Sequence, residues 1–121
     1  MSQVKTEIRA MLDAATPATP LSALLDNVGR ILQSHPDELK GITYAYRFCV
    51  KDTGLVKAFS LVDGQYFEKT EMDEADCILS ATEKDMMDIF LRKQKPLTAL
   101  LRGKLILSGS KAAMLRFAEF L

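Results

Sequence analysis

The sequence has no tryptophan, one histidine and two cysteines among its 121 residues. Cys49 and Cys77 are far apart and lack the spacing of a metal-binding pair, and no cysteine neighbours His35. A zinc site is therefore not expected, and His35, beside a proline in a turn, is expected to be solvated. We expect both cysteines to be buried thiols in strands, and the alternative is a disulfide between neighbouring strands.

The chain also lacks an excess of charge and any long apolar run. Its 16 basic and 16 acidic residues give a formal net charge of zero. A protein that binds nucleic acid or an anionic membrane as its main partner needs a basic surface, so neither partner is expected. No apolar run is long enough to span a membrane, and Lys5, Glu7 and Arg9 argue against a secretory leader. We therefore expect a cytoplasmic protein.

What the chain does have is enough apolar residues for one folded domain, preceded by a separate helix. Hydrophobic residues make up 48% of the sequence, which is typical of a domain with a real core. Helical spacing relates Val4, Ile8, Met11, Leu12 and Ala15. Prolines then interrupt the pattern, so we divide the chain into an amphipathic helix with a linker, 1–18, and a domain, 19–121. The helix is expected to pack on the domain; the alternatives are disorder, or detachment to bind a lipid interface, a second copy or another protein.

Apolar periodicity and turn residues predict the order of elements in the domain. Thr19 and Pro20 are expected to begin the first helix as its N-cap and first residue, and Ser110 is expected to cap the last helix. The predicted order is helix 19–33, strands 42–51, 55–62, 65–70 and 75–81, helix 83–93, a helical turn 96–102, strand 104–108 and helix 110–121. Short turns make the first three strands antiparallel, whereas the helical connection before the last strand allows a parallel pairing there. The expected fold class is α+β: a five-stranded, mostly antiparallel sheet with helices on one face.

A set of motifs in the second half of the domain resembles a known family. Residues 75–81 read ADCILSA and precede TEKDM, an acidic helix start capped by Thr82 and Asp85. Pro96 and Ala99 follow, then GKL at 103–105 and a glycine at 109. In this order and spacing the motifs resemble the sterol carrier protein type 2 family, a small lipid-transfer fold, and the similarity covers roughly residues 20–121.

The resemblance implies non-catalytic binding or transfer of an apolar ligand, such as a fatty acid or sterol, in a cavity between the sheet and the helices. We expect ligand contact from apolar residues of the inner strands and the later helices: Tyr44, Tyr46, Phe48, Phe59, Met86, Met87, Phe90, Leu101, Met114 and Phe117. Flexible methionines suit a pocket of low selectivity. The alternative is that these side chains only fill the core. No cofactor is expected.

Features that would support other functions are weak. Asp73, Glu74 and Asp76 form an acidic connector that is expected to be solvated, and no base accompanies either cysteine, so we do not expect an enzyme. A basic cluster near a helix end would give at most peripheral membrane contact, or only helix-end charge: Arg92, Lys93, Lys95 and Arg102. The alternative function is an accessory module with a collapsed cavity, acting as a dimer or as a subunit in lipid or quinone metabolism, with residues 4–15 as its contact.

Overall fold

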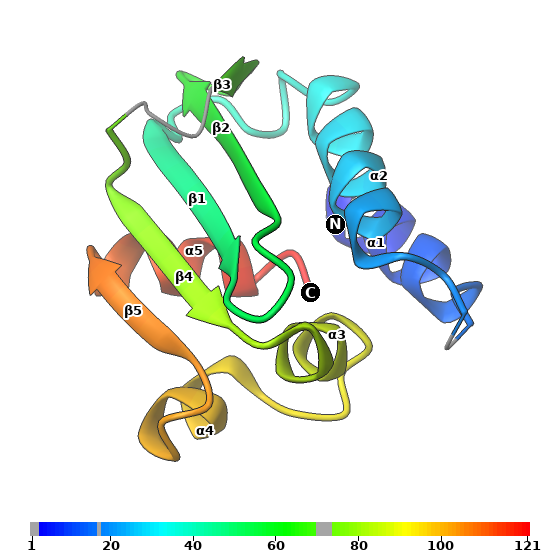
Figure 1. Ribbon diagram of the computed structural model, residues 1–121. Coiled ribbons are helices and arrows are strands. Elements are labelled where there is room, and N and C mark those ends of the chain that lie inside the picture. Colours follow the sequence, from blue (N-terminus) through cyan, green and yellow to red (C-terminus); the bar gives the residue numbers. More distant parts are fainter. Residues whose placement is uncertain (1–2, 17, 70–73) are drawn as a thin grey trace.

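The computed structural model describes residues 3–16, 18–69 and 74–121, and in it the helices gather on one side of a single twisted sheet (Figure 1). The elements in chain order are α1 (Gln3–Asp13), α2 (Leu21–Gln33), β1 (Tyr44–Val50), β2 (Val56–Val62), β3 (Gln65–Lys69), β4 (Cys77–Ala81), α3 (Glu83–Phe90), α4 (Pro96–Leu101), β5 (Ile106–Gly109) and α5 (Lys111–Ala118). None of the helices in these described segments has the length and apolar character needed to cross a membrane.

The sheet confirms the predicted fold class. Its five strands lie in the order β3-β2-β1-β4-β5, and three of the four pairings are antiparallel. The one parallel pair joins β1 and β4, so the suggestion that the last strand could be parallel to its neighbour was wrong. Figure 1 shows the reason: α3 and α4 both lie beyond the end of the sheet where β4 finishes, so β5 starts at that end and runs back.

Strand β1 alternates between a helix-covered face and an open face, as its period-two pattern predicts. Tyr46, Phe48 and Val50 are almost fully buried, whereas the residues between them are partly exposed. The register places Phe59 of β2 and Cys77 of β4 beside Tyr46. The most apolar surface of the sheet is therefore its centre, on the side that α2, α3 and α5 cover.

Two of the three predicted side-chain N-caps are confirmed. The Thr82 hydroxyl oxygen accepts a hydrogen bond from the Asp85 amide at 3.3 Å, and Ser110 accepts one from the Ala113 amide at 3.0 Å. The predicted cap of α2 was wrong, because Pro20 occupies the N-cap position and provides no side-chain acceptor. Thr19 instead accepts from the Thr16 amide at 3.0 Å and closes the preceding turn.

Helix α1 is part of the core. Val4 and Ile8 are fully buried and Leu12 is 2% exposed, and together they belong to the same apolar cluster as the domain residues. The division of the chain at residue 18 stays a prediction, but this packing agrees with a helix that is held on the domain.

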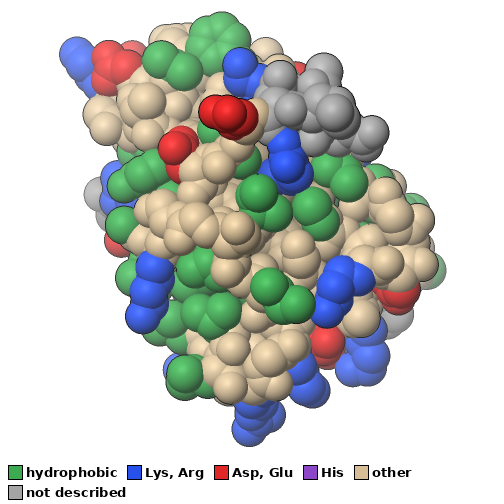
Figure 2. Space-filling model, turned by 60° about the vertical axis from the view of Figure 1, so that its left-hand side comes forward, with side chains coloured by type: hydrophobic (Ala, Val, Ile, Leu, Met, Phe, Trp, Pro, Cys, Tyr) green, Lys and Arg blue, Asp and Glu red, His purple; other side chains and the backbone are tan. Residues whose placement is uncertain are grey.

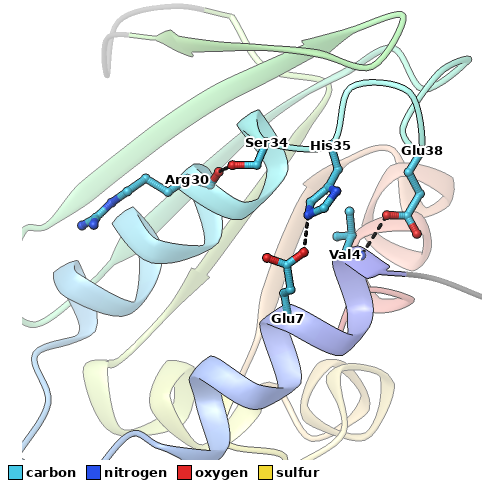
Figure 3. A network of polar contacts seen from close by, with 6 residues as sticks. All are labelled: Val4, Glu7, Arg30, Ser34, His35 and Glu38. Carbon is cyan, nitrogen blue, oxygen red and sulfur yellow. Dashed lines mark hydrogen bonds and ion pairs between the residues drawn. The ribbon is translucent and has the colours of Figure 1, made fainter.

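Polar contacts hold α1 at both ends, and Figure 3 shows those at its start. The Val4 amide donates to a Glu38 carboxylate oxygen at 2.8 Å, and His35 contacts Glu7. At the other end Arg92 contacts Asp13 at 2.5 Å. The expectation that His35 is solvated was wrong: its side chain is 18% exposed, because the turn after α2 folds over α1.

These contacts predict that α1 contributes directly to stability. Replacing the fully buried Ile8 by alanine should lower the free energy of unfolding by about 2–5 kcal/mol, measured by urea denaturation. The exposed Ala10 provides the control, since Ala10→Glu should change it by less than about 0.5 kcal/mol. An Ile8→Ala variant as stable as the wild type would mean that the helix detaches in solution.

Candidate functional site

A cavity of about 210 Å³ lies between α2 and strands β1, β2 and β3. Its inner wall is formed by buried aromatic and aliphatic side chains: Leu25, Val28, Phe48, Phe59 and Phe117. Charged side chains surround its opening: Asp26, Lys57, Glu68 and Lys69. The cavity is thus apolar inside and polar at its rim, which is the usual organisation of a small-molecule site.

Three nearly parallel aromatic rings from adjacent strands border the cavity. The rings of Phe48 and Phe59 are stacked with centroids 6.2 Å apart, and those of Phe59 and Tyr66 are 5.3 Å apart. The ring of Phe117, from α5, lies 5.1 Å from that of Phe48. Rings fixed in this way present a rigid apolar surface, against which an alkyl chain or another flat ring can pack without reorganisation.

Lys57 explains why α2 leaves this space open. The register pairs Lys57 with Phe48, so its side chain starts on the helix-covered face of the sheet. A lysine ammonium is not buried without a partner, and here it reaches the edge of α2 to contact Asp26 at 3.0 Å. The pair is partly exposed, at 38% and 51%, so its own contribution to stability is small. Its effect is to place a long polar side chain where an apolar one would have closed the core.

Tyr66 and Gly29 form a close contact at the edge of the cavity. A Cβ atom built on Gly29 would lie 2.5 Å from the Tyr66 hydroxyl, so only glycine lets the tyrosine ring lie this close to α2. Burial, together with the nearby Glu68 and Asp26 carboxylates, raises the pKa of Tyr66 to about 12. The hydroxyl is therefore neutral at physiological pH. Sequence reasoning missed both residues, although a glycine within a helical stripe is a known signal of close approach.

The predicted ligand-binding residues separate into three groups in the structure, and their assignment to a ligand stays a prediction. Phe48, Phe59 and Phe117 line the 210 Å³ cavity. Met86, Phe90 and Met114 meet Phe48 and Phe117 at a second, apolar space of only about 20 Å³. That volume is about one water probe, so these side chains pack as a filled core there.

The remaining predicted residues line neither space. Tyr46 is buried and donates a hydrogen bond from its hydroxyl to the Ala113 carbonyl at 2.7 Å, and burial raises the pKa of this hydroxyl. Tyr44 and Met87 are partly exposed. Leu101 is 88% exposed, because the short helix α4 turns Ala99 inward instead. Leu101 therefore does not lie with the other predicted ligand-binding residues.

Exposed apolar side chains do not form one dominant surface in the view of Figure 2. In that view they lie in small groups separated by charged and neutral polar atoms. Large exposed apolar residues of the described chain occur on several elements: Val62, Phe67, Leu97, Leu101, Ile106 and Leu115. Scattered exposure of this kind is ordinary for a folded domain.

The described carboxylates of the acidic connector, Glu74 and Asp76, are exposed as expected, and Asp76 also has a structural role. The Asp76 carboxylate accepts from the Ala45 amide at 2.7 Å, and its carbonyl accepts from the Ser110 amide at 2.7 Å. Asp73 lies outside the described residues. No group of three or more His, Cys, Asp or Glu side chains suited to a metal ion occurs in the parts of the chain that the structure describes.

Comparison with known proteins places these features in a family. The family model of the SCP-2 sterol transfer family matches residues 23–121. A search of curated protein sequences gave no match.

Solved structures with the same fold include both small proteins and part of a large one. The palmitated SCP2L2 of Aedes aegypti is 18% identical, with a TM-score of 0.51 over 98% of this chain and 93% of that one. UbiJ-SCP2, a ubiquinone synthesis protein, is 22% identical, with a TM-score of 0.53 over 97% and 91%. A stereoselective inverting sec-alkylsulfatase from Pseudomonas sp. is 21% identical, with a TM-score of 0.68 over 90% of this chain but only 17% of its own. At these identities the likeness establishes the shared fold.

The two cysteines are predicted to react very differently. Cys77 is fully buried, and burial with the adjacent Asp76 carboxylate raises the pKa of its thiol from 9.0 to about 11. The thiol therefore stays protonated at pH 8, with a thiolate fraction on the order of 0.1%. Native protein treated with iodoacetamide at pH 8 should gain one adduct, on the partly exposed Cys49, by mass spectrometry.

Matched variants identify the reacting thiol. Native Cys77→Ser protein should still gain one adduct and Cys49→Ser protein none, whereas urea should make both thiols of the wild type reactive. Rapid labelling of Cys77 in the native protein would contradict the packing of β4.

Proposed function

The chain belongs to the SCP-2 sterol transfer family, and we propose that it binds an apolar or amphipathic molecule, without catalysis, in the cavity between α2 and the sheet. Membership of the family implies apolar lipid binding or transfer. The main support for binding at this site is the 210 Å³ cavity, with its wall of Phe48, Phe59 and Phe117 and its charged rim.

The physical basis is burial of apolar surface against preformed rings. Each methylene removed from water contributes about 0.8 kcal/mol, and the rings need no rearrangement to receive it. A polar head can remain at the rim, where Lys57, Lys69, Asp26 and Glu68 give no net charge. The site therefore selects a ligand by its apolar part more than by the sign of the charge on its head group.

A second candidate function is that of an accessory module that holds the apolar part of a substrate for an enzyme. It is favoured by the sec-alkylsulfatase, in which this fold makes up 17% of the chain, and by the ubiquinone synthesis protein. A protein contact through residues 4–15 would have to use the polar side of α1, since Val4, Ile8 and Leu12 face the core. An accessory module would co-purify with a defined partner and take up ligand only in its presence, whereas the binder works alone.

The proposed domain division takes a modified form. The family match begins at residue 23, yet the core continues into α1. We propose that residues 1–18 and 19–121 act as one unit, in which α1 supports α2 and thereby the wall of the cavity.

Filling the cavity should weaken binding. Leu25 lines it and is 8% exposed, so Leu25→Trp places an indole in the space without adding charge. Uptake of a fluorescent fatty acid, followed by its emission, should weaken at least tenfold in this variant. Leu115→Trp, on an outer part of α5 where the leucine is 39% exposed, is the control and should bind as the wild type does.

Two results would oppose the proposal. A wild-type protein that contains no lipid by native mass spectrometry and takes up no fluorescent fatty acid is not a binder on its own. Equal uptake by the wild type and Leu25→Trp, with both folded by circular dichroism, would place the ligand elsewhere.

A further inference from the structure

We infer that Tyr66 is the residue that limits ligand length, and that the cavity therefore takes a single-ring or short-chain amphiphile rather than the whole of a long acyl chain. This inference rests on the proposed function and concerns the same site. It follows from the cavity volume, from a second hollow beyond Tyr66 and from the contact of Tyr66 with Gly29.

The cavity is small. Its volume of about 210 Å³ is below the lower limit of roughly 300 Å³ that is usual for sites of drug-sized ligands. A closed apolar cavity of about 150 Å³ accepts one benzene ring. The space therefore suits a substituted ring or a short alkyl chain, and a long chain would leave much of its length outside.

A second space borders Tyr66. A more open hollow of about 350 Å³ lies along the next turns of α2, where it is lined by Gly29, Arg30 and Gln33. The cavity and the hollow share four lining residues: Asp26, Lys57, Tyr66 and Glu68. They are thus neighbours along one groove between α2 and the edge of the sheet.

The ring of Tyr66 forms the barrier between the two spaces. Of the four shared residues only Tyr66 has a ring, and this ring spans from Phe59, at a centroid distance of 5.3 Å, to the backbone of α2 at Gly29. The Asp26–Lys57 pair is partly exposed and can move with little loss of stability. The tyrosine ring is fixed by stacking on Phe59 on one side and by its close contact with Gly29 on the other. It is therefore the side chain that separates the two spaces.

The chemistry of the groove fits an amphiphile whose polar head points outward. The inner space is bounded by phenylalanine rings, Arg30 and Gln33 line the outer hollow, and the Asp26–Lys57 pair borders both spaces. Without the ring of Tyr66 the groove would run from the apolar interior to these polar groups without interruption. A longer alkyl chain could then be buried along it.

The test compares octanoate with palmitate by isothermal titration calorimetry, below their aggregation concentrations. In the wild type, palmitate should bind no more than about threefold tighter than octanoate, because only a short segment is buried. In Tyr66→Ala protein, palmitate should bind at least tenfold tighter than octanoate. Tyr66→Phe keeps the ring and is the matched control, with the wild-type ratio expected. Tyr66→Val provides a strand-compatible variant if the alanine variant does not fold.

A second pair of variants tests the contact of the Tyr66 ring with Gly29. Gly29→Ala would place a methyl group against the tyrosine hydroxyl and displace the ring, so the octanoate-to-palmitate ratio should change. The same substitution in the Tyr66→Ala background should leave the ratio of that background unchanged, since the ring is absent. A ratio altered equally in both backgrounds would show that Gly29 acts on α2 and not through Tyr66.

The outcomes separate this inference from the proposed function. If the wild type binds both probes and Tyr66→Ala has the same ratio, or if the wild type already prefers palmitate by tenfold or more, Tyr66 does not limit length although the site binds. If the wild type binds neither probe nor any fluorescent fatty acid, the proposed binding function fails first, and the inference with it.

Discussion

The packing of Phe117 on the centre of the sheet is the interaction on which the rest of the structure depends. Its ring lies 5.1 Å from that of Phe48, 5.5 Å from that of Tyr46 and 6.3 Å from that of Phe59. It also meets Phe90 of α3 at 6.2 Å. One side chain of the last helix thus joins β1, β2 and α3, and it borders both the filled part of the core and the open cavity. Aromatic pairs of this geometry add directional stability to simple burial.

The core is filled on one side of Phe117 and open on the other because different side chains meet on its two sides. Toward α3 the space is closed by Met86, Phe90 and Met114, which adapt their shape to their neighbours. Toward α2 the corresponding inward position of β2 carries Lys57, which extends to Asp26 at the surface. A charged side chain on the covered face keeps a path to solvent, and this path is the mouth of the cavity.

Helix α1 supports this arrangement from behind α2, with which it packs through a fully apolar stripe. Its polar contacts reach the turn after α2 and the segment after α3, so it connects parts of the chain that border the two sides of the core. The cavity wall made by α2 is therefore backed by a second layer. A site for an apolar ligand benefits from such rigidity, because less conformational freedom is lost when the ligand binds.

The sequence by itself determined the order and type of the elements, the helix caps at Thr82 and Ser110 and the inward face of β1, since period and capping chemistry are local properties of the chain. It also identified the family through motifs in its second half. Only the tertiary structure decided that β1 pairs in parallel with β4, and that the sheet register sets Lys57 beside Phe48. The cavity, and the packing of Tyr66 against Gly29, depend on those contacts between distant parts of the chain. Periodicity shows which face of a strand a side chain lies on. Which side chains it then contacts is set by how elements far apart in the chain pack together.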